Sequence, residues 1–138
     1  SINAGGKGTA APYLGYGWSE PESTHTWNDG NEASLEFLIE PTDSDLELEL
    51  KLKPFLVPGK VDQQRIRISV GERSVGDLRL TKDELQVVRV TIPNDTFEGS
   101  GLTVILGLPD AESQVAINEG DDGRKLAIAI VSMSISVK

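Results

Sequence analysis

The chain has 138 residues, of which 38% are apolar, 25% are charged and none is cysteine, which fits one domain with a single core and excludes disulfides and cysteine-bound metals. The 22 acidic residues outnumber the 13 basic ones and give a formal net charge of −9. Nucleic acid is therefore not expected as a partner, because this charge repels a phosphate backbone.

Residues 1–12 are small, rich in glycine and almost without bulky side chains. Such a segment buries too little apolar surface to offset the entropy lost on ordering, so it is predicted to be a flexible linker before a single domain at 13–138. Because the chain begins with Ser1, it is expected to be an excised or processed part of a longer protein. It contains no apolar run near the roughly 20 residues that span a bilayer, so direct membrane insertion of this fragment is not expected.

Alternation of apolar and polar residues, the pattern of a strand with one buried face, begins at Ala33. It is clearest in residues 46–53, where four leucines alternate with four charged residues. Residues 33–39 alternate in the same way, and a turn at 41–45 separates the two segments, so they are expected to be neighbours. Further strands are predicted at residues 65–70, 75–80, 85–92, 102–106 and 126–137.

Three details complete the predicted secondary structure. The alternation of the last strand changes phase near Ile130, as a β-bulge would make it. An eighth strand is considered at residues 13–18, and Thr81 with Glu84 three positions later has the capping pattern of one helical turn. Since no ten-residue helical period occurs, the chain is predicted to be all-β, with two antiparallel sheets packed face to face in a jelly-roll sandwich.

Two stretches are too long for ordinary hairpin turns, and functional residues are expected there. The first, residues 13–30, holds four of the seven aromatic residues, both tryptophans and the only histidine. The second, residues 109–125, contains the sequence Asp121-Asp122-Gly123-Arg124. We refer to these stretches as the aromatic segment and the Asp-Arg loop.

The order of short motifs along the chain resembles a group of jelly-roll accessory domains appended to bacterial membrane glycosyltransferases and related envelope-polysaccharide enzymes. The motifs are Gly17-Trp18-Ser19-x-Pro21-Glu22, Trp27-x-Asp29-Gly30 and Asp122-Gly123-Arg124-Lys125-Leu126. The resemblance implies a non-catalytic domain like a carbohydrate-binding module, carried by a larger membrane protein on the periplasmic side of the inner membrane. Ala127 stands where this group typically has glycine.

The two tryptophans allow two interpretations. Trp18 and Trp27 can form a stacking surface for sugar rings, because a pyranose presents C–H groups to an aromatic face. Alternatively, both rings anchor the ends of the sandwich core, since aromatic residues make up only 5% of the chain. An exposed pair would favour the first interpretation.

Acidic side chains next to glycines form two groups in these stretches. Carboxylates together with backbone carbonyls are the ligands that Ca²⁺ prefers, and Glu20 and Asp121 are the metal candidates. The resemblance also implies a structural Ca²⁺, because sandwich-type carbohydrate modules often carry one. The alternative is solvated loop charge with one ion pair, for which Glu22 and Arg124 are the candidates if the first and last strands are adjacent.

His25 is the only side chain with an ordinary pKa near neutrality, but a zinc site needs further histidine or cysteine ligands that the chain lacks. A Ser-His-Asp triad from Ser19 or Ser23 with His25 and Asp29 lacks a nucleophile-elbow motif. The fragment itself is therefore not expected to be an enzyme.

The sequence thus predicts an accessory domain of an envelope glycosyltransferase that binds glycan or positions the parent enzyme's acceptor. The alternative is a structural or protein-interaction module that binds no sugar. The predicted carbohydrate-binding residues, expected near one end of the sandwich, are Trp18, Trp27, Glu22, Asp29, Asp122 and Arg124.

Overall fold

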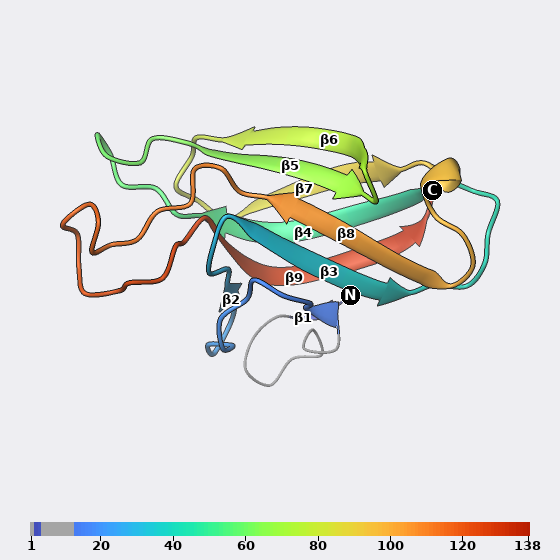
Figure 1. Ribbon diagram of the computed structural model, residues 1–138, viewed down its shortest axis with the longest axis horizontal. Coiled ribbons are helices and arrows are strands. Elements are labelled where there is room, and N and C mark those ends of the chain that lie inside the picture. Colours follow the sequence, from blue (N-terminus) through green and yellow to red (C-terminus); the bar gives the residue numbers. More distant parts are fainter. Residues whose placement is uncertain (1, 4–12) are drawn as a thin grey trace.

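The computed structural model describes residues 2–3 and 13–138, which form two antiparallel β-sheets packed face to face (Figure 1). The prediction of an all-β, jelly-roll-like sandwich is confirmed. In the first sheet the order is β1 (Ile2–Asn3), β9 (Ile128–Val137), β4 (Leu46–Pro54) and β7 (Gln86–Ile92), and β2 (Thr26–Trp27) also pairs with β9. In the second sheet it is β3 (Glu32–Leu38), β8 (Gly101–Gly107), β5 (Gln64–Val70) and β6 (Arg73–Leu80). A short 3₁₀ turn, η2 (Asn94–Thr96), follows β7.

The alternating sequence creates the core between the sheets. All four leucines of β4 are buried, while Lys51 and Lys53 are exposed. The leucines belong to one cluster with Leu35 of β3, Ile68 of β5 and Leu106 of β8 from the opposite sheet. Each such leucine contributes on the order of 2 kcal/mol through burial, so the pattern of period two fixes which face of each strand points inward.

The phase change near Ile130 is a bulge in the pairing of β9 with β4. Leu52 pairs with Ile130 and Lys51 pairs with Ser132, which leaves Val131 as the extra residue. Ile130 on one side of the bulge and Met133 on the other are both buried. The bulge therefore keeps apolar side chains in the core on both sides of it, as predicted, whereas Val137 at the end of the strand is exposed.

The expected neighbours at residues 33–39 and 46–53 lie in different sheets. β3 pairs with β8, whereas β4 pairs with β7 and β9. Both strands bury an apolar face in the same core, so they face one another across the sandwich instead of sharing hydrogen bonds. Alternation specifies the buried face of a strand but not its partner.

Two smaller predictions were wrong. Residues 13–18 form isolated bridges, Leu14 with Leu35 and Trp18 with Asn28, instead of a strand of their own. Residues 81–84 form bends without a helical turn. The Gln86 side chain donates hydrogen bonds to the carbonyls of Lys82 (2.9 Å) and Glu84 (3.2 Å), which holds this connection in a different conformation.

At the N-terminus, β1 pairs with Ser132 and Met133 of β9. The rest of the predicted linker, residues 1 and 4–12, lies outside the described residues, so the linker remains a prediction. In the part of the chain that the structure describes, no helix has the length and apolar character needed to cross a bilayer.

Candidate functional site

The aromatic segment folds into a short arm that lies against β9. The Ser19 N–H donates to the Trp27 carbonyl (2.9 Å), and the Glu22 N–H donates to the His25 carbonyl (2.8 Å). Residues 22–25 therefore form the tip of the arm. Its returning strand, β2, pairs with Ala129 and Ile130 of β9. This pairing brings the sequence around both tryptophans to the strand that follows the Asp-Arg loop.

Asn28, which the sequence analysis did not single out, joins the arm to the start of β9. Its buried side-chain oxygen accepts hydrogen bonds from the N–H groups of Ala127 (2.7 Å) and Ile128 (2.9 Å). Its amide nitrogen donates to the carbonyls of Gly30 (2.9 Å) and Lys125 (3.1 Å). One side chain thus satisfies four backbone groups and fixes the aromatic segment beside the Asp-Arg loop.

Gly17 lets the arm pass close to β3. Its φ is +85°, and a Cβ atom there would lie 2.2 Å from the Glu32 carbonyl oxygen. No other residue type fits this position without moving backbone. The Gly17 carbonyl accepts a hydrogen bond from the Asp29 N–H (2.8 Å), and Asp29 Oδ1 accepts one from the Lys125 N–H (3.0 Å). The exposed Asp29 is thereby placed at the junction of the two stretches.

The two tryptophans occupy different environments. Trp18 is half-buried against the main core, and its Nε1–H donates to the Ser34 carbonyl (2.8 Å). Trp27 is half-buried in a second apolar cluster that includes Phe55 and Leu126. The Trp27 ring meets Phe55 edge-on (centroids 6.2 Å apart) and His25 edge-on (6.0 Å). Trp18 therefore acts as a core anchor, whereas Trp27 lies beside His25 of the arm tip.

Arg124 does not pair with Glu22, which corrects the sequence-based candidate. Its Nε lies 3.0 Å from Asp122 Oδ1 and its Nη2 lies 2.6 Å from Asp122 Oδ2. The guanidinium therefore forms a two-bond contact with the carboxylate two residues earlier. This local fork needs no ordering of a second loop. Glu22 instead contacts the ring of His25, with Oε2 3.4 Å from Nε2.

Electrostatics nevertheless connects both stretches. The hydrogen bond from Arg124 is the largest of the effects that lower the pKa of Asp122. The pKa of Arg124 is raised mainly by its bond to Asp122, against partial desolvation, and further by the charges of Asp122, Glu22 and Asp29. Glu22 and Asp29 of the aromatic segment therefore lie close enough to Arg124 for Coulombic attraction, so the structure brings these predicted residues to one rim of the sandwich.

The metal candidates do not gather into a site. Glu20 and Asp121 are both exposed. Within residues 2–3 and 13–138, no three or more histidine, aspartate and glutamate side chains are arranged to hold a metal ion. The implied structural Ca²⁺ therefore has no group of three such side chains to hold it among the described residues.

The Ser-His-Asp triad considered from the sequence is not assembled. His25 Nδ1 lies 2.9 Å from Thr24 Oγ1, and its Nε2 faces Glu22. The Ser19 hydroxyl is buried and has no hydrogen-bond partner in the described chain. The arrangement therefore lacks the contact between hydroxyl and imidazole that activates a serine nucleophile.

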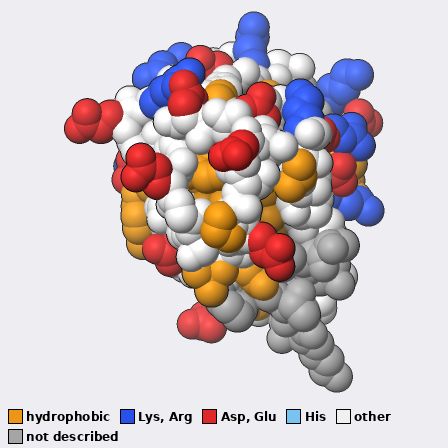
Figure 2. Space-filling model, turned by 90° about the vertical axis from the view of Figure 1, so that its right-hand side faces the viewer, with side chains coloured by type: hydrophobic (Ala, Val, Ile, Leu, Met, Phe, Trp, Pro, Cys, Tyr) orange, Lys and Arg blue, Asp and Glu red, His pale blue; other side chains and the backbone are white. Residues whose placement is uncertain are grey.

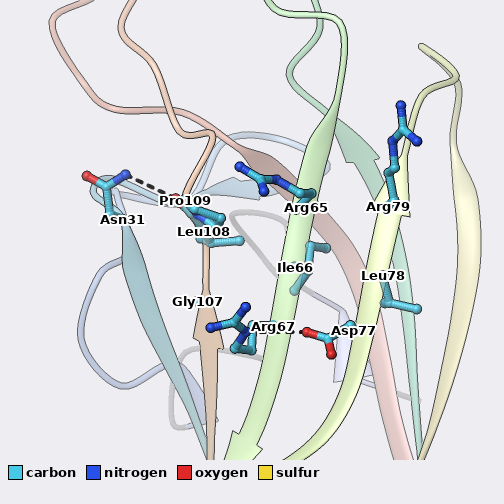
Figure 3. Close-up of a pocket in the computed structure, with 10 residues that line it drawn as sticks. All are labelled: Asn31, Arg65, Ile66, Arg67, Asp77, Leu78, Arg79, Gly107, Leu108 and Pro109. Carbon is cyan, nitrogen blue, oxygen red and sulfur yellow. Dashed lines mark hydrogen bonds and ion pairs between the residues drawn. The ribbon is translucent and has the colours of Figure 1, made fainter.

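A groove on the second sheet was also missed. It has a volume of about 530 Å³ and is lined by residues of β5, β6 and the end of β8 (Figure 3). Three arginines line it, Arg65, Arg67 and Arg79. The alternation Arg65-Ile66-Arg67 indicates that two of them share the outer face, but the place of Arg79 depends on strand register, which the sequence does not specify.

No family model matches this chain, and no curated protein matches it. Among solved structures, the C-terminal CBM6 of LamC, a marine laminarinase from Zobellia galactanivorans, is similar with a TM-score of 0.56 and 15% identity, over 99% of this chain and 97% of that one. The CBM22-1 xylan-binding domain of Paenibacillus barcinonensis Xyn10C has a TM-score of 0.53 and 14% identity, over 90% and 78%. The chain has the jelly-roll fold of carbohydrate-binding modules.

One similar structure is much larger. A family GH115 4-O-methyl-α-glucuronidase with specificity for decorated arabinogalactans matches with a TM-score of 0.56 and 11% identity. The match covers 85% of this chain but 15% of the glucuronidase chain. At these identities the likeness concerns the fold.

Proposed function

We propose that this chain is a glycan-binding accessory domain and that it binds sugar at the rim where the aromatic segment meets the Asp-Arg loop. The rim site consists of Trp27, Glu22, Asp29, Asp122 and Arg124. The observation that carries the proposal is their convergence, which combines an aromatic ring with several carboxylates and a guanidinium on the fold of a carbohydrate-binding module.

The rim offers the two kinds of contact that a sugar needs. A pyranose packs its C–H groups against an aromatic ring, for which Trp27 is the candidate, and its hydroxyls exchange hydrogen bonds with charged groups. Asp122 bonds Nε and Nη2 of Arg124, which leaves Nη1 for a hydroxyl. Trp18, whose Nε1–H is bonded to Ser34, would hold the arm in place instead of touching the sugar.

The resemblance to envelope-enzyme domains extends this proposal. In that setting the parent protein is a bacterial membrane glycosyltransferase, the domain lies on the periplasmic side of the inner membrane, and binding presents glycan acceptor to the parent enzyme.

A glycan array tests the proposal directly. We expect the wild-type chain to bind at least one neutral glycan on the array and the Trp27→Ala variant not to bind it. Arg89→Gln is the matched control, because Arg89 is an exposed, ion-paired residue of β7 away from the rim. Absence of binding to all glycans at millimolar concentration, or equal binding by Trp27→Ala, would reject the rim site.

A second candidate function, a protein-interaction module without sugar binding, is favoured by an apolar patch at the opposite end of the sandwich. Leu38 is 85% exposed and Val137 is 60% exposed, beside a hollow of about 350 Å³ that Ile39 and Ile135 help to line. Figure 2 shows apolar side chains among charged ones on this end. This alternative predicts that the folded chain binds no glycan on the array.

A further inference from the structure

The groove on the second sheet opens where two paired strands separate. β8 pairs with β5 from Val104 to Gly107, after which the chain turns away through Leu108 and Pro109 while β5 continues to Gln64. Figure 3 shows Arg65 and Arg67 on β5 with their guanidinium groups on the side of β8, and Arg79 on the adjacent β6, on the other side of β5. Its volume of about 530 Å³ is in the range of small-ligand sites.

The charge of this groove is opposite to that of the chain. Three arginines and one aspartate, Asp77, line it, although the whole chain carries a formal net charge of −9. Arg65 and Arg79 are directly opposite one another on paired strands. Like charges in this position destabilise a sheet unless a negative group lies close to them. Asp110 supplies that group for Arg65 but not for Arg79.

The three arginines differ in how far they are already paired. Arg65 Nε and Nη2 are held by Asp110 at 2.9 and 2.8 Å, which orients this guanidinium and leaves Nη1 unused. Arg67 has a single contact of 3.4 Å with Asp77, between two largely exposed side chains. Arg79 pairs with β5 through its backbone, but its side chain has neither a hydrogen bond nor an ion pair with any residue that the structure describes. The groove thus combines a pre-oriented guanidinium with a guanidinium that lacks a counter-charge.

The rest of the lining indicates what carries the anion. Leu78 and Pro109 supply the accessible apolar surface, with Ile66 and Leu108 buried beneath them, and no aromatic ring lines the groove. A neutral sugar would therefore lack a stacking partner, whereas an acidic sugar can place its C–H groups on the apolar surface and its carboxylate on the arginines. Guanidinium groups match carboxylates in a planar, two-bond geometry.

We propose, on the basis of the glycan-binding function proposed above, that this groove binds a uronic acid residue of an acidic glycan, with the carboxylate held between Arg65 and Arg79. Arg67, two residues along β5 on the same face, supports the negative charge. The groove is distinct from the rim site. Its positive charge comes from three arginines, while the acidic remainder of the chain disfavours long polyanions such as nucleic acid.

Isothermal titration of the chain with trigalacturonic acid and with α-1,4-galactotriose, its carboxyl-free counterpart, tests the proposal. We expect binding of the acidic trisaccharide only, weakened by added NaCl because exposed charges are screened. Arg79→Gln should weaken it about tenfold or more, equivalent to ~1.4 kcal/mol, because it removes the unpaired guanidinium. Asp77→Asn should strengthen it, because it removes the opposing carboxylate from the groove. A gain of affinity cannot arise from misfolding.

Two controls separate this site from the rim. Arg89→Gln removes the same charge from the opposite sheet and should leave binding of trigalacturonic acid unchanged. Trp27→Ala should also leave binding of trigalacturonic acid unchanged, while it abolishes binding to neutral glycans on the array. If neutral glycans fail to bind but trigalacturonic acid binds and Arg79→Gln weakens that binding, the groove proposal is supported and the rim proposal fails.

Several results would overturn the proposal that the groove binds a uronic acid residue. The proposal fails if trigalacturonic acid does not bind at millimolar concentration or if galactotriose binds equally well. It also fails if Arg79→Gln leaves the affinity for trigalacturonic acid unchanged or if Asp77→Asn weakens it. Stronger binding of a sulfated heparin trisaccharide would contradict the carboxylate assignment, and equal binding of a short single-stranded DNA would contradict the glycan assignment.

Discussion

Asn28 and Ile128 lie 100 residues apart in the sequence and are joined by two hydrogen bonds. The Ile128 N–H donates to the Asn28 side-chain oxygen (2.9 Å), and the Asn28 N–H donates to the Ile128 carbonyl (3.1 Å). Both residues are buried. This connection closes the sandwich at the rim, because it fixes the aromatic arm on the strand that follows the Asp-Arg loop.

Replacing Asn28 by alanine should therefore destabilise the fold strongly. The substitution leaves the buried N–H groups of Ala127 and Ile128 without their side-chain acceptor, and we expect a loss of about 3 kcal/mol in the free energy of unfolding. Urea denaturation measures it. Asn94→Ala is the control, because Asn94 makes an exposed side-chain bond to the Asp43 carbonyl and should cost less than about 1 kcal/mol. Equal losses in the two variants would show that Asn28 does not fix the arm.

Gly17 and Gly59 form a matched pair for testing the close approach of the arm to β3. Their φ values are +85° and +81°, but a Cβ atom at Gly17 would meet the Glu32 carbonyl at 2.2 Å, whereas one at Gly59 would meet no atom within 4 Å. Gly59→Ala should cost about 1 kcal/mol through backbone strain alone. Gly17→Ala should cost about 2 kcal/mol more because of the added clash. Similar melting temperatures for the two variants would contradict the described packing of the arm.

The pair of Arg65 and Asp110 should make stability depend on pH in the acidic range. The hydrogen bond from Arg65 is the main reason that the pKa of Asp110 is lowered, with partial burial opposing it. A carboxyl whose pKa is lower in the folded state stabilises the fold fully above its unfolded pKa of about 3.9, and this contribution disappears as the pH falls through the folded pKa.

Asp110→Asn should accordingly reduce stability at pH 7 by about 1 kcal/mol, since Arg65 is half-exposed and solvent screens the pair. The difference from wild type should shrink below pH 4. Urea denaturation between pH 7 and pH 2.5 measures both effects. Glu40→Gln, which removes an exposed carboxylate, is the control for the loss of charge alone. A difference that persists unchanged at pH 2.5 would contradict the proposed linkage.

Much of the fold could be predicted because burial imposes a period of two on each strand. The leucines of β4 and the phase change at Ile130 are visible in the sequence for this reason. Strand partners could not be predicted, since β3 and β4 have the same pattern whether they pair or face one another across the core. The pairing of Arg65 with Arg79 likewise depends on register.

The candidate rim was predicted in part. Its two stretches meet as the sequence indicated, because β2 of the aromatic segment pairs with β9, the strand that follows the Asp-Arg loop. The pairing of Glu22 with Arg124 was wrong, since a guanidinium reaches a carboxylate two residues away at a smaller entropic cost than one on another loop. Asn28 was missed because an asparagine between two more conspicuous residues gives no sign of which backbone groups it will meet.

The fluorescence of Trp27 tests the central claim, glycan binding at the rim, most directly. In Trp18→Phe, Trp27 is the only tryptophan, and titration with xylohexaose, laminarihexaose and chitohexaose reports contact at its ring. We predict that at least one of these sugars shifts its emission to shorter wavelength and protects it from acrylamide, because a stacked sugar excludes water from the indole. Calorimetric binding of any of them with unchanged Trp27 emission, or no binding of any, would contradict the rim site.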